Sequence, residues 1–149
     1  MNVFLIHPDP ARSTSLFLAA DPIRARKQLL ECCQILASVD HTLLGYTGMR
    51  KANGDYYKAA HPHHPITKLC ADVQAMYSLT LDVTLELARA LPDHACSRSL
   101  KEWDPMVSWE NDHRLICCRA GSPPLIVHSR EEYAKVMLEY LITRKWATK

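Results

Sequence analysis

Residues 65–91, PITKLCADVQAMYSLTLDVTLELARAL, decide the fold of this chain. Apolar side chains recur in this stretch at intervals of three and four, and only a helix places such residues on one face. They are Ile66, Leu69, Val73, Met76, Tyr77, Leu81, Leu85, Ala88 and Leu91. Pro92 follows and ends the pattern, because proline cannot continue a helix. The sequence therefore predicts one long helix at the centre of a mainly all-α domain.

Further helices are predicted by their start signals. Asp-Pro pairs at residues 9–10 and 21–22 each supply an N-cap followed by a proline at the first helical position. The second pair begins a helix expected over residues 22–39. Ser129, with Glu132 three residues later, forms a capping box for a last helix that runs almost to the C-terminus. Four principal helices follow, with little sheet.

The remaining segments are expected to be less regular. Residues 3–6 suit an extended N-terminal segment packed on the helices. Residues 41–64 hold three of the four glycines and predict a functional loop, and residues 95–128 form an irregular excursion or a short hairpin. One compact domain covering residues 1–149 is expected, with these buried residues in its core: Leu30, Cys33, Leu36, Leu69, Val73, Met76 and Leu85.

Composition limits the functional classes. An apolar fraction of 48% with 23% charged residues indicates a globular chain, and a net charge of +2 is too small to indicate a polyanion partner without local clustering. No stretch resembles a signal peptide or a membrane span, so we expect a cytoplasmic protein without a membrane partner. The six cysteines contain no C-x-x-C pair, and we expect them to be reduced, apolar residues. Neither a metal nor a cofactor is predicted.

The helix expected at residues 22–39 has a continuous polar face. Its members share spacings of three and four and are Arg24, Lys27, Gln28, Glu31 and Gln34. A solvated surface with a Lys27–Glu31 pair would give the same pattern. The glutamines and the acidic start at Asp21 instead favour a site in which acid, base and amide groups meet. The candidate catalytic residues are Asp21, Arg24, Lys27 and Glu31.

A second cluster lies in the loop at residues 41–64. Cations contact phosphates and aromatic rings stack on bases, so basic residues interleaved with tyrosines indicate a nucleic-acid surface. An ordinary exposed loop is the alternative. The candidate binding residues are Arg50, Lys51, Tyr56, Tyr57, Lys58, His61 and His64. The histidines lack the ligand spacing of a zinc site.

These features, taken in order, resemble a known family. The chain contains D-P-x-x-S at residues 9–13, D-x-x-R-x-x-K-Q-x-x-E-x-x-Q-I-L at residues 21–36, Gly45-Tyr46, and His64-Pro65 at the start of the long helix. Together they resemble the small phage and bacterial proteins grouped with pyrimidine-dimer DNA glycosylases of the endonuclease V type. The tyrosine-rich segment from Tyr133 to Trp146 also resembles the C-terminal helix of phage members. The resemblance covers most of the chain.

The resemblance implies an all-helical protein that binds duplex DNA, flips a nucleotide and attacks its sugar carbon with an amine assisted by a carboxylate. The family's enzymes use the α-amine exposed when the initiator methionine is removed before a small residue. Asn2 follows Met1 here, and Lys27 is the alternative amine if desolvation or Arg24 lowers its pKa. The family's glutamate corresponds to Glu31 or has no counterpart, with Gln28 nearest its position.

The sequence thus predicts a DNA glycosylase/lyase that acts on damaged or modified bases by Schiff-base chemistry. Two other classes remain open. One is a non-catalytic protein that binds nucleic acid, a nucleotide or a host protein, for example in phage defence or counter-defence. The other is a modified-base enzyme that does not cleave the strand. Related scaffolds host different activities, so only the site can distinguish these classes.

Overall fold

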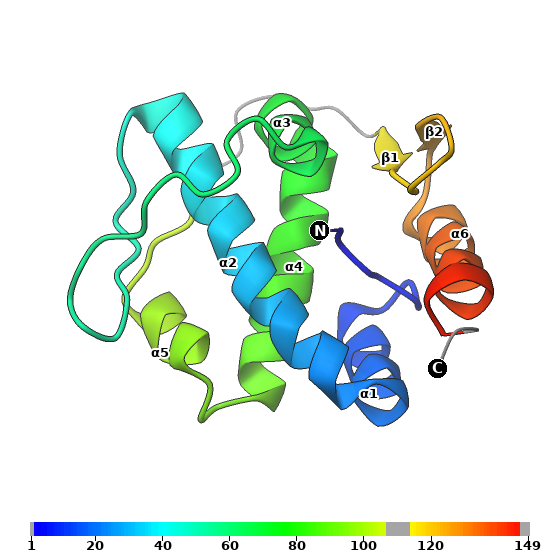
Figure 1. Ribbon diagram of the computed structural model, residues 1–149, viewed down its shortest axis with the longest axis horizontal. Helices are drawn as coiled ribbons and strands as arrows, with labels where there is room; N and C mark the ends of the chain where they lie inside the picture. Colours follow the sequence, from blue (N-terminus) through cyan, green and yellow to red (C-terminus); the bar gives the residue numbers. More distant parts are fainter. Residues whose placement is uncertain (1, 107–113, 147–149) are drawn as a thin grey trace.

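A computed structural model describes residues 2–106 and 114–146. Within them the chain is mostly helical, with one small antiparallel sheet, as Figure 1 shows. The helices are α1 (Pro10–Ala20), α2 (Pro22–Leu44), α3 (Pro65–Asp72), α4 (Gln74–Ala90), α5 (Ala95–Lys101) and α6 (Arg130–Tyr140), followed by a π-helical turn at Leu141–Lys145. The strands are β1 (Leu115–Cys117) and β2 (Leu125–Val127). The mainly helical class predicted from the sequence is confirmed, with six α-helices in the described residues instead of four.

The first two helices begin where the Asp-Pro pairs predict. Asp9 caps α1 by accepting a hydrogen bond from the backbone N–H of Ala11, and Asp21 caps α2 by accepting one from Arg24. The second helix is longer than the predicted 22–39, because nothing stops it before Gly45. Gly45 adopts φ +83°, a left-handed conformation that glycine reaches without strain.

The predicted single helix over residues 65–91 is instead two helices. Val73 has an extended conformation, φ −120° and ψ 107°, and separates α3 from α4. Its backbone N–H still closes α3 by donating to the carbonyl of Leu69 at 2.8 Å. α2 packs against both α3 and α4, and α1 packs against α4. The expected central packing therefore holds, but through a bent pair of helices.

The buried side of the long segment differs in part from the side that the sequence predicts. Val73 and Met76 are buried as predicted, and so are Cys33 and Leu36 on α2. Leu69 is only partly buried. Leu30 and Leu85 are 41% and 40% exposed, so their assignment to the core was wrong. In α4 the interior is formed by a different apolar set with the same spacing: Met76, Leu79, Val83 and Leu87.

The N-terminal segment is extended and crosses the middle of the molecule, as predicted (Figure 1). Val3 and Leu5 are fully buried. The Gln28 amide bridges this segment to α2, since its Oε1 accepts from the N–H of Phe4 and its Nε2 donates to the Phe4 carbonyl, both at 3.3 Å. The Tyr133 hydroxyl donates to the Val3 carbonyl at 2.7 Å from the side of α6. The segment is thus held between α2 and α6.

The stretch predicted as irregular, residues 95–128, contains regular structure. Its first residues form α5, and β1 pairs with β2 as a short hairpin, the alternative that the sequence left open. Residues 107–113, including Trp109, lie outside the described part of the chain. The predicted capping box is present at the start of α6, where the Ser129 hydroxyl accepts from the N–H of Glu132 at 3.1 Å. None of the helices described is long and apolar enough to span a membrane.

Candidate functional site

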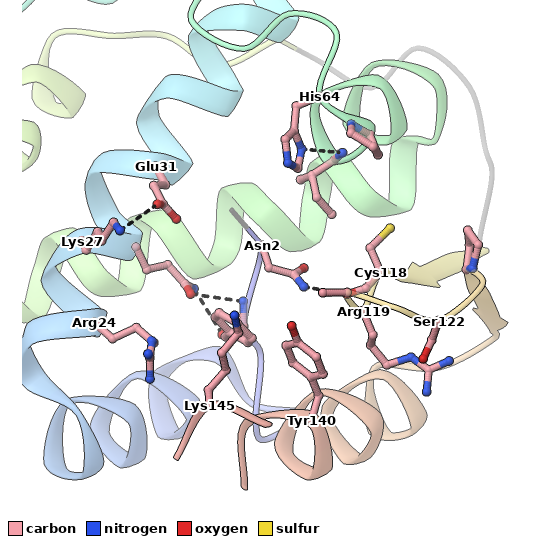
Figure 2. Close-up of a pocket in the computed structure, with 16 residues that line it drawn as sticks. Asn2, Arg24, Lys27, Glu31, His64, Cys118, Arg119, Ser122, Tyr140 and Lys145 are labelled. Carbon is pink, nitrogen blue, oxygen red and sulfur yellow. Dashed lines mark hydrogen bonds and ion pairs between the residues drawn. The ribbon is translucent and has the colours of Figure 1, made fainter. Parts of the chain in front are cut away.

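A cavity of about 520 Å³ opens between the first half of α2, the start of α3, the N-terminal segment, the turn of the hairpin and the end of the chain. Figure 2 shows polar side chains from all of these elements pointing toward it. We call it the central pocket. Its lining side chains are Asn2, Phe4, Arg24, Lys27, Gln28, Glu31, His64, Pro65, Ile66, Cys118, Arg119, Ser122, Pro124, Tyr140 and Lys145, with Ala120.

The wall from α2 carries three of the four residues proposed for catalysis. Arg24, Lys27 and Glu31 lie one helical turn apart and line the central pocket. Lys27 Nζ lies 3.9 Å from Glu31 Oε1, and the Lys27 side chain is 72% exposed against 23% for Glu31. Lys27 is therefore hydrated, and the desolvation that would activate its amine is not provided by the protein alone. Glu31 is the more enclosed of the two.

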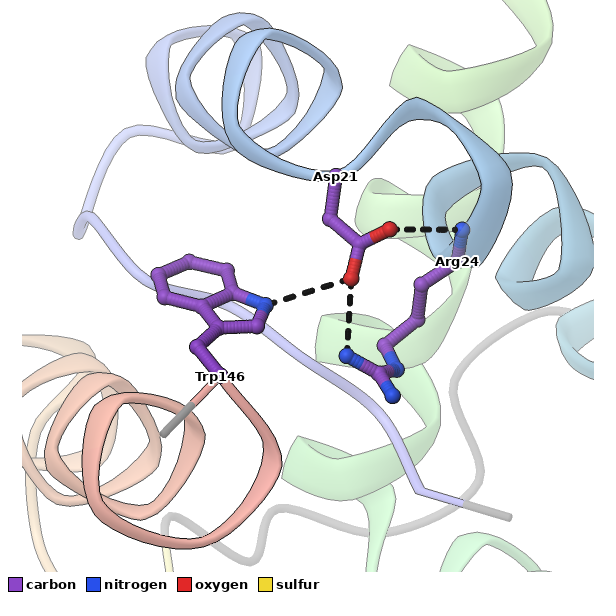
Figure 3. Close-up of polar contacts among 3 residues, drawn as sticks. All are labelled: Asp21, Arg24 and Trp146. Atoms are coloured by element: carbon purple, nitrogen blue, oxygen red, sulfur yellow. Dashed lines mark hydrogen bonds and ion pairs between the residues drawn. The ribbon is translucent and has the colours of Figure 1, made fainter. Parts of the chain in front are cut away.

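Asp21, the fourth proposed catalytic residue, lies beside the central pocket and does not line it. Its side chain is 5% exposed and holds three groups together, as Figure 3 shows. Oδ2 pairs with Arg24 Nη1 at 2.7 Å and accepts from Trp146 Nε1 at 3.2 Å, while Oδ1 accepts the Arg24 backbone N–H. The carboxylate therefore fixes the Arg24 guanidinium and the end of the chain. Asp21 thus positions a residue of the pocket without lining the pocket itself.

His64 is the residue of the predicted nucleic-acid set that reaches the central pocket. It caps α3, and its Nδ1 accepts the backbone N–H of Ile66 at 3.2 Å, so the proton of the neutral imidazole is on Nε2. Burial lowers the pKa of His64 below its usual value, and the nearby Glu31 carboxylate opposes this only in part. A neutral N–H donor is thereby available on the side of the pocket formed by α3.

Sequence reasoning missed the far wall of the central pocket. Asn2 comes from the N-terminal segment, and its Nδ2 donates to the Cys118 carbonyl at 2.6 Å. Arg119 comes from the hairpin turn, and Lys145 from the π-helical turn, where its Nζ lies 5.7 Å from the centroid of the Tyr140 ring. These residues carry no motif, because elements far apart in sequence bring them together.

The charges of the central pocket favour an anionic ligand. Arg24, Lys27, Arg119 and Lys145 supply four cations, whereas Glu31 is the only carboxylate among the described lining residues. Guanidinium and ammonium groups bind phosphate, and one carboxylate among them can move a proton or stabilise a cationic intermediate. The arrangement thus suits a phosphorylated molecule with a reacting centre near Glu31.

The other predicted binding residues lie in the loop at residues 45–64, which we call the outer loop. Arg50 and Lys51 line a separate groove of about 330 Å³ together with Arg98 of α5. Arg50 is held by Tyr56, since its Nη2 donates to the Tyr56 hydroxyl at 2.6 Å and its guanidinium carbon lies 4.5 Å from the ring centroid. Lys58 is exposed. The structure therefore separates these cations from the central pocket.

Tyr57 and His61, two members of the predicted binding set, line neither the central pocket nor the groove beside Arg50. Tyr57 is 7% exposed, and its hydroxyl lies 3.5 Å from Cys96 Sγ, so it cannot stack on a base, and its assignment as a binding residue was wrong. Burial raises the pKa of Tyr57 above its usual value. His61 is exposed and has φ 59°.

The cysteines and the metal-binding residue types give no further site. All six cysteines are free, and five of them are buried. In residues 2–106 and 114–146, no group of three or more histidine, cysteine, aspartate or glutamate side chains is placed to hold a metal ion. Comparison with known proteins finds no family model, curated protein or solved structure that matches this chain. Function is therefore argued from the geometry of the central pocket.

Proposed function

We propose that the chain is a DNA-processing enzyme that takes one nucleotide of a DNA strand into the central pocket and acts on its glycosidic bond. The observation that supports this proposal is the lining of a cavity of about 520 Å³, where the described residues supply four cations and one carboxylate, Glu31. Pockets for small molecules commonly measure roughly 300–1,000 Å³, so one extruded nucleotide is a suitable occupant.

Lys27 and Glu31 take the reacting roles. The Lys27 amine forms a bond to the sugar C1′ as the glycosidic C1′–N bond breaks, and the base leaves with the electron pair of that bond and gains a proton. Opening of the sugar ring then gives an imine between Lys27 and the sugar, and loss of the 3′ phosphate cleaves the strand. Glu31 moves the protons of these steps and stabilises the cationic intermediate.

Because Lys27 is exposed, the substrate itself must remove water from around the lysine amine. The lysine needs an unprotonated amine, and its side chain is hydrated in the protein alone. A nucleotide that enters the central pocket displaces water from around the amine and can draw the Glu31 carboxylate, 3.9 Å away, into its own contacts. An amine reacts as a nucleophile more readily once water and its counter-ion are removed. Activation is therefore coupled to occupancy of the pocket.

The outer loop supplies contacts to the DNA backbone in this proposal. Arg50 and Lys51 line a groove of about 330 Å³, smaller than the central pocket, and Lys58 lies on the exposed surface. Contacts of this kind add affinity that does not depend on base sequence and that falls as salt rises. The central pocket would determine which nucleotide reacts.

The exposure of Lys27 also favours a second candidate, a non-catalytic protein that binds DNA or a nucleotide in the same pocket. A hydrated ammonium 3.9 Å from a carboxylate is well suited to binding phosphate and poorly suited to attack on carbon. A modified-base enzyme without strand cleavage would likewise use the pocket without a lysine–sugar imine. Both alternatives predict DNA binding without a covalent intermediate.

Borohydride trapping distinguishes these functions. The protein is incubated with duplex DNA carrying defined lesions or an abasic site, together with sodium borohydride, which reduces an imine to a stable amine. The expected result is a covalent protein–DNA adduct whose cross-linked peptide contains Lys27. Lys27→Ala should abolish the adduct, while Lys68→Ala, which removes an exposed lysine outside the pocket, should not.

Two outcomes would contradict the proposal. Tight DNA binding without any adduct across the lesion series would establish the non-catalytic alternative or the enzyme without strand cleavage. An adduct of full yield in Lys27→Ala would assign the nucleophile to a different amine.

A further inference from the structure

Arg119 belongs to a turn that fixes its backbone. It lies between β1 and β2, and the turn is closed by a hydrogen bond from the N–H of Ser122 to the Arg119 carbonyl at 3.1 Å. Gly121 within the turn has φ +79°, which glycine adopts without strain. Arg119 lines the central pocket on the side opposite α2, and Figure 2 shows its guanidinium directed along the turn toward Ser122.

The guanidinium of Arg119 is incompletely satisfied. Nε is shielded from solvent and has no hydrogen-bond partner among the described residues. Nη2 makes one long contact, 3.5 Å, to the carbonyl of Pro123. A shielded donor without a partner is unfavourable, and a partly desolvated guanidinium attracts an anion more strongly than a hydrated one. The group is thus prepared for an oxyanion that the described residues do not supply.

Arg119 is one of several cations that line the central pocket. Arg24 is fixed on the α2 side by Asp21, and Lys145 extends from the end of the chain beside the Tyr140 ring (Figure 2). These three cations come from three separate elements and line one cavity. Cations that line one cavity favour an anionic ligand such as a phosphate, whose oxygens a planar guanidinium binds through parallel hydrogen bonds.

We propose that Arg119 binds a phosphate of the nucleotide that occupies the central pocket, and that the hairpin turn is therefore a phosphate-binding wall of the site. The inference rests on the proposed function only in taking a nucleotide as the occupant. The same oxygens are offered by the diester of a DNA strand and by the monoester of a free nucleotide. The experiment must distinguish these two sources.

The shielding of Arg119 Nε gives a direct measurement. A proton that is protected from water exchanges slowly, so the Nε–H group should give an observable signal in ¹H–¹⁵N spectra, assigned by its disappearance in Arg119→Gln. We expect this signal to shift on titration with a deoxynucleoside 5′-monophosphate or with a five-nucleotide single strand. The deoxynucleoside without phosphate should leave it in place.

Affinity gives the second measurement. Arg119→Gln should weaken binding of the phosphate-bearing ligands by on the order of tenfold or more, because the variant cannot form the charge-assisted hydrogen bonds to phosphate. Arg119→Lys should recover part of the affinity, since it restores the charge without the planar fork. Arg26→Gln is the matched control, because Arg26 is exposed on α2 and does not line the pocket. Melting temperatures of all three variants test their folding.

Unchanged affinity in Arg119→Gln, or a signal that does not move at saturating ligand, would overturn the inference even where borohydride trapping succeeds. Binding of the monophosphate but not of the strand would support the phosphate contact, identify a free nucleotide as its source, and contradict the proposed DNA substrate. Binding of the strand through Arg119 without any covalent adduct would likewise support the phosphate contact of Arg119. It would contradict the proposed attack of Lys27 on the sugar.

Discussion

The central pocket and the outer loop both gather cations, but the two regions are built differently. In the pocket, each cation comes from a separate element or helical turn, and Arg24 is locked by the buried carboxylate of Asp21. In the outer loop, the cations lie close in sequence on an exposed surface, and Arg50 is steadied only by the ring and hydroxyl of Tyr56. The pocket therefore surrounds a ligand with groups from several elements, whereas the outer loop offers mainly exposed positive charge.

This difference predicts separate effects for the two regions. A change at the reacting groups of the pocket, Lys27 and Glu31, should alter the reaction more than the affinity, because these two groups act on the bond that breaks. A change in the outer loop should alter affinity and its salt dependence, because exposed cations contribute through release of counterions. Variants that remove one region at a time test this separation.

The largest effect is expected for Glu31→Gln. The substitution keeps size and hydrogen bonding but removes the carboxylate that moves protons, a role worth about 100-fold or more in rate. Adduct formation in single-turnover trapping measures the effect. Glu86→Gln is the control, because Glu86 pairs with Arg89 at 3.0 Å outside the pocket. Equal rates for both variants would leave the proposed function without its acid–base group.

A smaller effect, on binding alone, is expected when Arg50, Lys51 and Lys58 are all replaced by alanine. The slope of log affinity against log salt should become shallower by about 0.9 for each phosphate of duplex DNA that the variant no longer neutralises. The control replaces three exposed cations elsewhere, Arg12, Arg26 and Lys68, and removes the same net charge.

Filter binding or fluorescence anisotropy at several salt concentrations measures this slope for both triple variants. Equal slopes would show that total charge alone governs binding and that the outer loop is not a specific DNA-binding surface. A lower single-turnover rate at saturating DNA in the loop variant would instead show that the outer loop contributes to the reaction. The proposed division of roles between loop and pocket would then be wrong.

The sequence could predict the parts of each region that depend on neighbours along the chain. Asp9 and Asp21 cap their helices as the Asp-Pro pairs indicate, and the polar face of α2 follows from helical spacing. The wall from the hairpin could not be predicted, because nothing local connects Arg119 with Arg24. The two line one cavity only after α2, the hairpin and residues near the C-terminus have packed together.

The misassigned core residues have a similar origin. Residues 76–87 carry two apolar sets with helical spacing, and periodicity alone does not say which set faces the interior. In α4 the side that carries Leu79, Val83 and Leu87 faces the interior, so Leu85 remains partly exposed. Tyr57 was likewise misread, because composition marks an aromatic residue in a loop without showing that a tertiary contact with Cys96 buries it.

Asp21→Ala tests whether a buried anchor organises the pocket. The variant removes the N-cap of α2 and leaves the Trp146 N–H without its acceptor, so the free energy of unfolding should fall by about 1–3 kcal/mol. Asp9→Ala is a matched control, since Asp9 is an exposed N-cap before proline and should cost less. Chemical denaturation measures both. Full stability with abolished activity would make Asp21 a reacting group instead of an anchor.

The smallest effect is expected for Asp40→Asn, at the base of the outer loop. Asp40 Oδ2 accepts from Thr47 Oγ1 at 2.7 Å and from Trp103 Nε1 at 3.0 Å, whereas Oδ1 is shielded without a hydrogen-bond partner among the described residues. Burial raises the pKa of Asp40 above its ordinary value of 3.8, although its two donors oppose the shift. Ionisation of this carboxyl therefore costs more in the folded protein than in the unfolded chain.

The sign of the pH dependence follows from this raised pKa. The contribution of Asp40 to stability is fully present below pH 3.8 and declines as the pH rises through its folded-state pKa, because the unfolded chain releases the proton first. Asparagine keeps a carbonyl acceptor and cannot ionise, so Asp40→Asn should remain within about 1 kcal/mol of the parent at neutral pH and lack this decline. Asp40→Ala should cost more, because it leaves both donors unpaired. Melting temperatures of the parent, Asp40→Asn and Asp40→Ala, taken from below pH 3.8 to neutral pH, measure these differences. A parent that instead gains stability over Asp40→Asn as the pH rises would show that the ionised carboxylate, paired with its two donors, fixes the base of the outer loop.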